Sequence, residues 1–161
     1  MRVLITYYSK TGSTERMARA VAAGVKEAKG VIVKLKRVEK ASLKDLVESD
    51  VIIVGSPTYY GLMAAQVKKL LDESVKIHGK LKGKVGGAFT SSGGSATGAE
   101  TTLMSIIQAM LVHGMIVQGN PEDKHYGAAC VRKPGKEDLK QCRELGRRLT
   151  ELASRLLKTA S

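Results

Sequence analysis

The chain alternates short apolar runs with longer stretches in which apolar residues recur every three or four positions. The short runs are typical of buried strands, and the longer periodic stretches predict amphipathic helices. Strands are predicted at residues 3–7, 31–38, 51–55, 84–90 and 115–119. Helices are predicted at residues 15–29, shortly after Ser42, at 64–74, through Leu103 to Leu111, and from Leu139 to Leu156. Ser42 is predicted to cap its helix, with Asp45 at the third helical position, as in a capping box. Residues 120–132 are predicted to be irregular.

Five strands that alternate with helices favour an α/β fold in which right-handed crossovers build a parallel sheet. The natural strand order is 2-1-3-4-5, a doubly wound sheet with helices on both faces. Residues 51–55 are apolar throughout and need neighbours on both sides, whereas residues 31–38 have one wetter face and belong near an edge. With 161 residues, 43% of them hydrophobic, and no linker or repeat, the sequence predicts a single domain over residues 1–161.

Three loops rich in small polar residues follow the first, third and fourth predicted strands, at residues 8–14, 56–61 and 91–95. In a doubly wound sheet, ligands bind at this end, near the switch point between the first and third strands. The first loop places hydroxyl groups and Gly12 before a helix, whose unpaired N–H groups bind anions. It has neither a Walker pattern nor G-x-G-x-x-G, so it favours a mononucleotide. A Ser/Thr helix cap without a ligand is the alternative.

Two other classes of protein with this topology do not match. A response regulator needs an Asp at the end of the third strand, where this chain has Gly55 and Ser56, and a low-molecular-weight phosphatase needs C-x5-R after the first strand, where this chain has no cysteine. The chain has five Tyr, one Phe and no Trp, so the pair Tyr59 and Tyr60 in a ligand-facing loop favours ring contact over ordinary surface aromatics. The three loops together fit a phosphate tail attached to a flat conjugated ring.

The composition is strongly basic. The chain has 27 Lys and Arg against 15 Asp and Glu, a formal net charge of +12 and a pI near 9.8. Such a charge suits nucleic acid or an acidic partner, but the basic residues are spread over the predicted surface helices and aromatics for base stacking are few. A solvated basic surface is therefore favoured over a nucleic-acid interface.

No apolar run is long enough to span a membrane, and the first strand begins too early to leave room for a signal peptide, so we expect a cytoplasmic protein. The two cysteines, Cys130 and Cys142, match neither a disulfide framework nor a metal spacing. We expect both to be inert thiols and predict no metal site.

An ordered set of short motifs resembles the flavodoxin-like FMN proteins and, within them, the WrbA-type NAD(P)H:quinone oxidoreductases. The resemblance runs over nearly the whole chain and depends on the set rather than on one motif. The matching residues are Tyr7-Tyr8-Ser9, Gly12, residues 15–21, Pro57-Thr58, Tyr60-Gly61, residues 63–66, Gly83-Lys84-Val85, Glu100-Thr101-Thr102, His113-Gly114-Met115 and Tyr126-Gly127-Ala128.

The resemblance implies a cofactor site at the three loops. The FMN phosphate would be held by Ser9, Lys10, Thr11, Gly12, Ser13 and Thr14. The isoalloxazine would be lined by Pro57, Thr58, Tyr59, Tyr60 and Gly61, with Tyr60 against the ring. The pyrimidine side of the ring would be approached by Ser91, Ser92, Gly93 and Gly94.

His113 matches a family residue near the flavin. Each helix descends from the ligand end of the sheet, so the end of the fourth helix lies on the far side of its own subunit. His113 could therefore reach a flavin only across an oligomer interface, and we expect a homo-oligomer if it does. The alternative is that His113, in the last turn of a helix, complements the helix dipole.

The leading hypothesis is an FMN-dependent oxidoreductase that takes electrons from NADH or NADPH and passes two of them to a quinone. The cofactor would carry the chemistry, and no catalytic acid or base is predicted in the protein. One alternative is a flavodoxin-type single-electron carrier that docks onto a redox protein partner. A further alternative is a non-catalytic binding module of the same fold that acts through its basic surface.

Overall fold

A seven-stranded sheet forms the centre of the computed structural model, which describes residues 1–159, so the last two residues of the predicted domain lie outside it. The main path of the sheet runs β2-β1-β3-β5-β6 and is parallel throughout. This path confirms the predicted order of five strands, with β2 at an edge. The strands are β1 (Arg2–Tyr7), β2 (Ile32–Arg37), β3 (Val51–Tyr59), β4 (Leu62–Met63), β5 (Val85–Ser92), β6 (Ile116–Val117) and β7 (Ala128–Val131).

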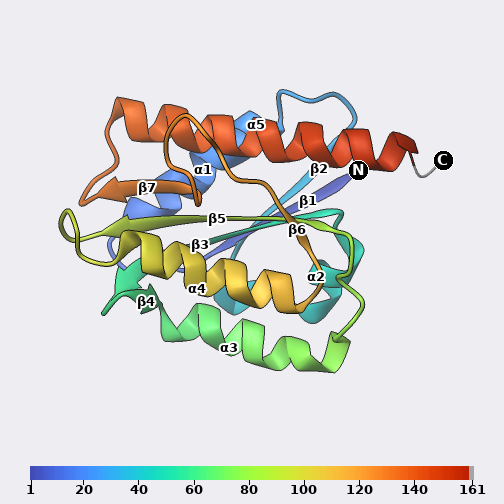
Figure 1. Cartoon of the computed structure of the whole chain (residues 1–161), viewed down its shortest axis with the longest axis horizontal. Coiled ribbons are helices and arrows are strands. Elements are labelled where there is room, and N and C mark those ends of the chain that lie inside the picture. Colours follow the sequence, from blue (N-terminus) through green and yellow to red (C-terminus); the bar gives the residue numbers. More distant parts are fainter. Residues whose placement is uncertain (160–161) are drawn as a thin grey trace.

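Helices cover both faces of the sheet (Figure 1). The helices are α1 (Ser13–Val25), α2 (Leu43–Glu48), α3 (Ala65–Glu73), α4 (Ala99–Val112) and α5 (Lys136–Thr159). One core cluster joins the sheet to α1 and α5, and the second joins the other face to α2, α3 and α4. The alternation along β1 feeds both clusters, because Val3 and Ile5 enter the first and Leu4 enters the second.

Two glycines let α1 and α5 pack backbone against backbone. A Cβ at Gly24 would collide with the Arg143 carbonyl, and one at Gly146 would collide with the Val21 carbonyl. The α1 helix ends at Val25, four residues earlier than the predicted end at Lys29, because the amides of residues 27 and 28 bond to the third residue before them instead of the fourth.

Two of the three predicted loops at the ligand end, and the segment predicted to be irregular, are partly strand. Residues 56–59 continue β3 and turn back to pair antiparallel with β4, so this loop is a hairpin. Ser91 and Ser92 continue β5, since β3 and β7 supply hydrogen-bonding neighbours on its two sides. The prediction that residues 120–132 are irregular is wrong for residues 128–131, which form β7. The strand predicted at residues 115–119 is reduced to β6, and β6 and β7 pair with opposite ends of β5.

The edge strand β2 is tied to α2 through a buried carboxylate. Asp45 completes the predicted capping box with Ser42. It also accepts hydrogen bonds from Lys34 and Lys36 at 3.1 and 2.8 Å. The more polar face predicted for β2 therefore carries two lysines, and both pair with Asp45 of the neighbouring helix α2.

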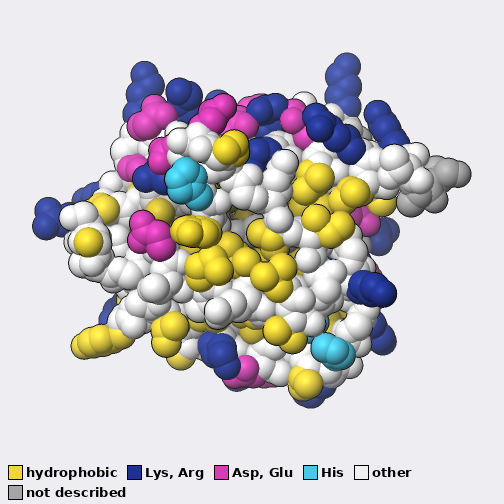
Figure 2. Space-filling view, in the orientation of Figure 1, with side chains coloured by type: hydrophobic (Ala, Val, Ile, Leu, Met, Phe, Trp, Pro, Cys, Tyr) yellow, Lys and Arg dark blue, Asp and Glu magenta, His cyan; other side chains and the backbone are white. Residues whose placement is uncertain are grey.

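The surface charge is distributed unevenly. Figure 2 shows hydrophobic side chains gathered at the centre of the face formed by α4, with Lys and Arg around its periphery. The α4 helix contains no Lys or Arg, so the basic residues are not spread over every helix. Among residues 1–159, no helix is both long and apolar enough to cross a bilayer.

Candidate functional site

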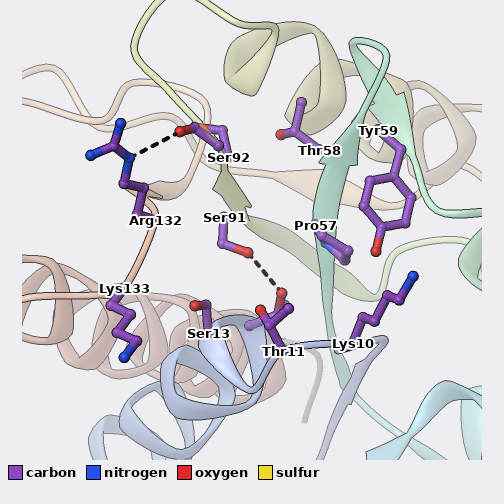
Figure 3. A pocket seen from close by; sticks show the side chains of 12 residues that line it. Lys10, Thr11, Ser13, Pro57, Thr58, Tyr59, Ser91, Ser92, Arg132 and Lys133 are labelled. Carbon is purple, nitrogen blue, oxygen red and sulfur yellow. Dashed lines mark hydrogen bonds between the residues drawn. The ribbon is translucent and has the colours of Figure 1, made fainter.

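A cavity of about 290 Å³ lies at the carboxyl ends of β1, β3, β5 and β7 (Figure 3). Its lining comes from the three loops singled out in the sequence and from one segment that was not. The lining residues are Lys10, Thr11, Ser13, Thr14, Pro57, Thr58, Tyr59, Ser91, Ser92, Gly93, Arg132 and Lys133. The structure thus brings ten of the sixteen predicted site residues together around one space.

The first wall of the cavity is the start of α1. Gly12 caps this helix with φ +92°, a left-handed conformation that glycine adopts at little cost, and no side chain caps the first turn. The Ser9 hydroxyl instead accepts a hydrogen bond from the Gly12 amide at 3.1 Å, which holds the loop closed beneath the helix. The first-turn amides are therefore left for an anion at the positive end of the helix dipole.

Thr14 and Ser91 join the first wall to β5. Their hydroxyl oxygens lie 2.9 Å apart, and the two residues are only 1% and 7% exposed. Two hydroxyl groups carry two hydrogens, and the bond between them uses one. Within residues 1–159 neither side chain makes another hydrogen bond, so one buried hydroxyl hydrogen remains for an acceptor in the cavity.

The opposite wall is the end of β3. Thr90 donates its only hydroxyl hydrogen to the Ser56 carbonyl at 2.7 Å, and its oxygen lies 3.0 Å from that of Thr58. Thr58 must therefore donate to Thr90, which leaves the lone pairs of Thr58 free to accept. Beside them, burial and then the neighbouring Tyr8 raise the pKa of Tyr59, so its phenol remains protonated near neutrality.

Tyr60 and Gly61 form the turn of the β3–β4 hairpin. Both have positive φ, +51° and +76°, as a two-residue hairpin turn requires. The turn packs against the start of α4, where a Cβ on Gly98 would lie 2.6 Å from the Gly61 Cα. Tyr60 is fully exposed and does not line the cavity, whereas Tyr59 does. The expected contact between Tyr60 and a ring stays a prediction.

Arg132 and Lys133 are the lining residues that the sequence did not indicate. They follow β7, which was predicted as irregular, so no strand end marked them as part of the site. Figure 3 shows them on one side of the cavity and Lys10 on the other. These three cations line the cavity, and no Asp or Glu is among its lining residues. The two adjacent basic residues after Val131 could have indicated an anion site in the sequence. Their position beside the cavity, however, follows only from the pairing of β5 with β7.

The remaining predicted residues lie outside the lining. Ser9, Gly12, Tyr60, Gly61 and Gly94 belong to the same three segments but do not face the cavity.

His113 lies elsewhere, at the end of α4 next to Gly114, whose carbonyl accepts from the Gly83 amide before β5 begins. This places it at the amino end of the strands, as the topology predicted, and its role toward a flavin stays a prediction.

His113 has a protein partner where it lies. Ser74 donates its hydroxyl to the Leu71 carbonyl at 2.6 Å, so the Nε2 of His113, 2.7 Å away, must donate to the Ser74 oxygen. The Nδ1 atom is then a buried acceptor without a partner within the described residues. Burial, and next the nearby His78, lower the pKa of His113. The ring is therefore held neutral as a packing element in its own subunit.

Neither cysteine lines the cavity. Cys130 and Cys142 are buried, and burial raises their pKa values to about 11 and about 12. Both remain protonated thiols at neutral pH, which agrees with the expectation that they are unreactive.

The donors around the cavity fit the phosphate of a mononucleotide. They comprise the uncapped amides of α1, the hydroxyl of Ser13, and the spare hydroxyl hydrogen of the Thr14–Ser91 pair, and such neutral donors can bind an anion. Pro57 and Tyr59 provide flat apolar surface on the opposite wall.

Comparison with known proteins agrees with this geometry. The model of the Flavodoxin family matches residues 5–144. The chain is 38% identical to a "Flavodoxin" of Aquifex aeolicus over 93% of this chain and 85% of that protein. It is 34% identical to an "NAD(P)H dehydrogenase (quinone)" of Archaeoglobus fulgidus over 96% of this chain and 98% of that protein.

A solved structure supports the same assignment. The flavodoxin, WrbA-like protein from Agrobacterium tumefaciens superposes with a TM-score of 0.83 at 27% identity, over 96% of this chain and 98% of that one. The resemblance drawn from the sequence is thereby confirmed, although relatives at similar identity carry two different names. On the match of fold, loops and sequence, the chain belongs to the flavodoxin family of flavoproteins.

Proposed function

We propose that the protein is an FMN-dependent oxidoreductase that passes two electrons from NADH or NADPH to a quinone. The observation that carries the proposal is the charge of the cavity, which is lined by Lys10, Arg132 and Lys133 and by no carboxylate. When bound, FMN would supply hydride chemistry: it would take a hydride from NAD(P)H and pass its two electrons to a quinone, which becomes a quinol with the hydrogen of the hydride and one proton from water.

Each wall of the cavity has a part in holding this cofactor. The amides at the start of α1, with Ser13 and Thr14, would bind the phosphate. Pro57 and Tyr59 would orient the ring, and Thr58 would accept a hydrogen bond from a ring N–H, because its own hydrogen is committed to Thr90. With only one such phosphate site in the cavity, we expect FMN in preference to FAD.

The cations favour two-electron chemistry over single-electron transfer. A hydride brings its electron pair, and thus negative charge, into the site in one step, and nearby positive charge lowers the free energy of that charged state. A single-electron carrier benefits when the second electron is difficult to add, which acidic surroundings achieve. This cavity has the opposite charge.

A rapid-mixing experiment tests the proposal. The FMN-loaded protein is mixed anaerobically with NADH or NADPH while the visible flavin absorbance is followed, and a quinone is then added. The proposal predicts fast bleaching by at least one dinucleotide and recovery of the absorbance on adding the quinone. Protein that stays oxidised with both dinucleotides, yet is reduced by dithionite, would refute it.

The second candidate function is that of a flavodoxin, a carrier of single electrons between redox proteins. It is favoured by the similarity to the Aquifex aeolicus protein of that name and by the absence, within residues 1–159, of an acid or base lining the cavity other than the phenol of Tyr59 and the cations. The experiment above separates the two functions, since a carrier has no need to react with NAD(P)H.

A further inference from the structure

We propose that Arg132 and Lys133, the basic pair, recognise the 2′-phosphate of NADPH, so that the protein uses NADPH in preference to NADH. This inference rests on the proposed function and extends it to the choice of dinucleotide. The 2′-phosphate is the sole chemical difference between NADPH and NADH. It is a monoester that carries about −1.5 to −2 charges near pH 7, more than either single phosphate of the diphosphate bridge.

The basic pair is available to a ligand. Arg132 donates from Nε to the Gly93 carbonyl at 3.4 Å, which fixes the base of the guanidinium. In the part of the chain that the structure describes, the terminal nitrogens of Arg132 and the Nζ of Lys133 have no protein acceptor or acidic partner. By contrast, Arg143 and Arg147 of α5 are paired with glutamates.

The backbone presents the pair rigidly. The Arg132 amide donates to the Ser92 carbonyl at 2.6 Å, directly after the β5–β7 pairing ends, and the next residue but one, Pro134, is buried. Arg132 also adopts φ +59°, a left-handed conformation that is unfavourable for a residue with a Cβ. Strained backbone of this kind is found disproportionately at binding sites, where the surrounding structure enforces it.

The pair is surplus to the needs of the FMN phosphate. That phosphate has the uncapped amides of α1 and the hydroxyls of Ser13 and Thr14, all of them neutral donors. Arg132 lies beside Ser92, on another wall of the cavity, and Lys133 lies on the same side of the cavity as Arg132 (Figure 3). Two adjacent cations at the edge of the cavity match one dianion that enters after the flavin.

The test uses FMN-loaded protein and calorimetric titration with adenosine 2′,5′-bisphosphate and with AMP. These probes differ by the 2′-phosphate and carry no reactive nicotinamide. We expect the native protein to bind the bisphosphate about tenfold more tightly or better, as charge-assisted contacts to a phosphate allow. Arg132→Asn, which tolerates the left-handed backbone, and Lys133→Gln should each remove most of this difference. Lys136→Gln is the control and should leave this difference unchanged, because Lys136 is exposed, lies three residues after Lys133 and does not line the cavity.

The outcomes separate this inference from the proposed function. Equal affinity of the native protein for the two probes would overturn the inference. So would Arg132→Asn or Lys133→Gln weakening FMN itself more than about twofold, since the pair would then serve the flavin phosphate. Loss of electron transfer to an acidic acceptor protein, with probe binding unchanged, would assign the pair to a protein partner. Discrimination between the probes without any reduction by NADPH would keep the phosphate site and reject the proposed reaction.

Discussion

The bond between Thr14 and Ser91 allows a sharp test of the phosphate site. Thr14 belongs to the first turn of α1, and Ser91 supports it from β5. We expect Ser91 to donate to Thr14, and Thr14 to donate its own hydrogen to the FMN phosphate. Thr14→Val keeps the shape of the side chain and removes the hydroxyl. A hydrogen bond to a charged group contributes about 1.5–3 kcal/mol, so FMN should bind about 10- to 150-fold more weakly.

Ser91→Ala removes only the supporting hydroxyl and should weaken FMN binding about two- to fivefold, because Thr14 keeps its hydrogen for the phosphate. Thr150→Val is the matched control. Thr150 is fully buried in α5, donates to the Gly146 carbonyl at 2.8 Å and lies outside the cavity lining. This control should bind FMN like the native protein.

Flavin fluorescence titration of the flavin-free protein measures these dissociation constants, with riboflavin as a second ligand that lacks the phosphate. The effect of Thr14→Val should be large for FMN and absent for riboflavin. An FMN affinity within about twofold of native would refute the assignment of Thr14 to the phosphate. Equal weakening of FMN and riboflavin would show that the valine disturbs the cavity as a whole.

Three further predictions concern stability and assembly. Burial, and next His78, lower the pKa of His113 from 6.5. The free energy of unfolding is therefore highest above about pH 6.5 and falls as the pH drops through the lowered pKa. In urea unfolding, His113→Gln should remove that decline, and a variant whose stability declines as much as that of the native protein would contradict the prediction. Asp45→Asn weakens the bonds to Lys34 and Lys36, whose side chains are 33% and 37% exposed. It should lower the free energy of unfolding by about 2–3 kcal/mol, and a change below about 0.5 kcal/mol in urea unfolding would argue against this pairing. If His113 does serve a flavin, light scattering must show an oligomer, and a fully active monomer would exclude that role.

The elements that depend only on residues close together in the sequence could be predicted from the sequence. Apolar runs identify β1 and the first part of β3, because a strand buried on both faces needs an unbroken apolar stretch. The capping box of Ser42 and Asp45 was likewise readable, since a helix cap involves residues three apart. The order of the sheet then follows from the handedness of the crossovers.

The parts that the sequence did not give depend on distant partners. Ser91 and Ser92 look like loop residues, and they are strand only because β3 and β7 flank them. Their neighbour β7 is short and mixed in character, so its position beside β5 could not be read from residues 128–131 alone. For the same reason Arg132 was missed. Which of the two tyrosines faces the cavity depends on the exact position of the hairpin turn at Tyr60.

The net charge of the protein and the charge of the cavity affect ligand binding in different ways. A net charge of +12 raises the local concentration of anions near the protein, but exposed charges more than about 8 Å from a ligand are largely screened at physiological salt. The selectivity of the cavity must therefore come from Lys10, Arg132 and Lys133, the cations that line it. Neutral donors at the start of α1 can bind a phosphate in a pocket shielded from water, while exposed cations act best on a charged group that arrives from solvent. Under the proposed function, this separation of donors would place FMN inside the cavity and the exchangeable dinucleotide at its edge.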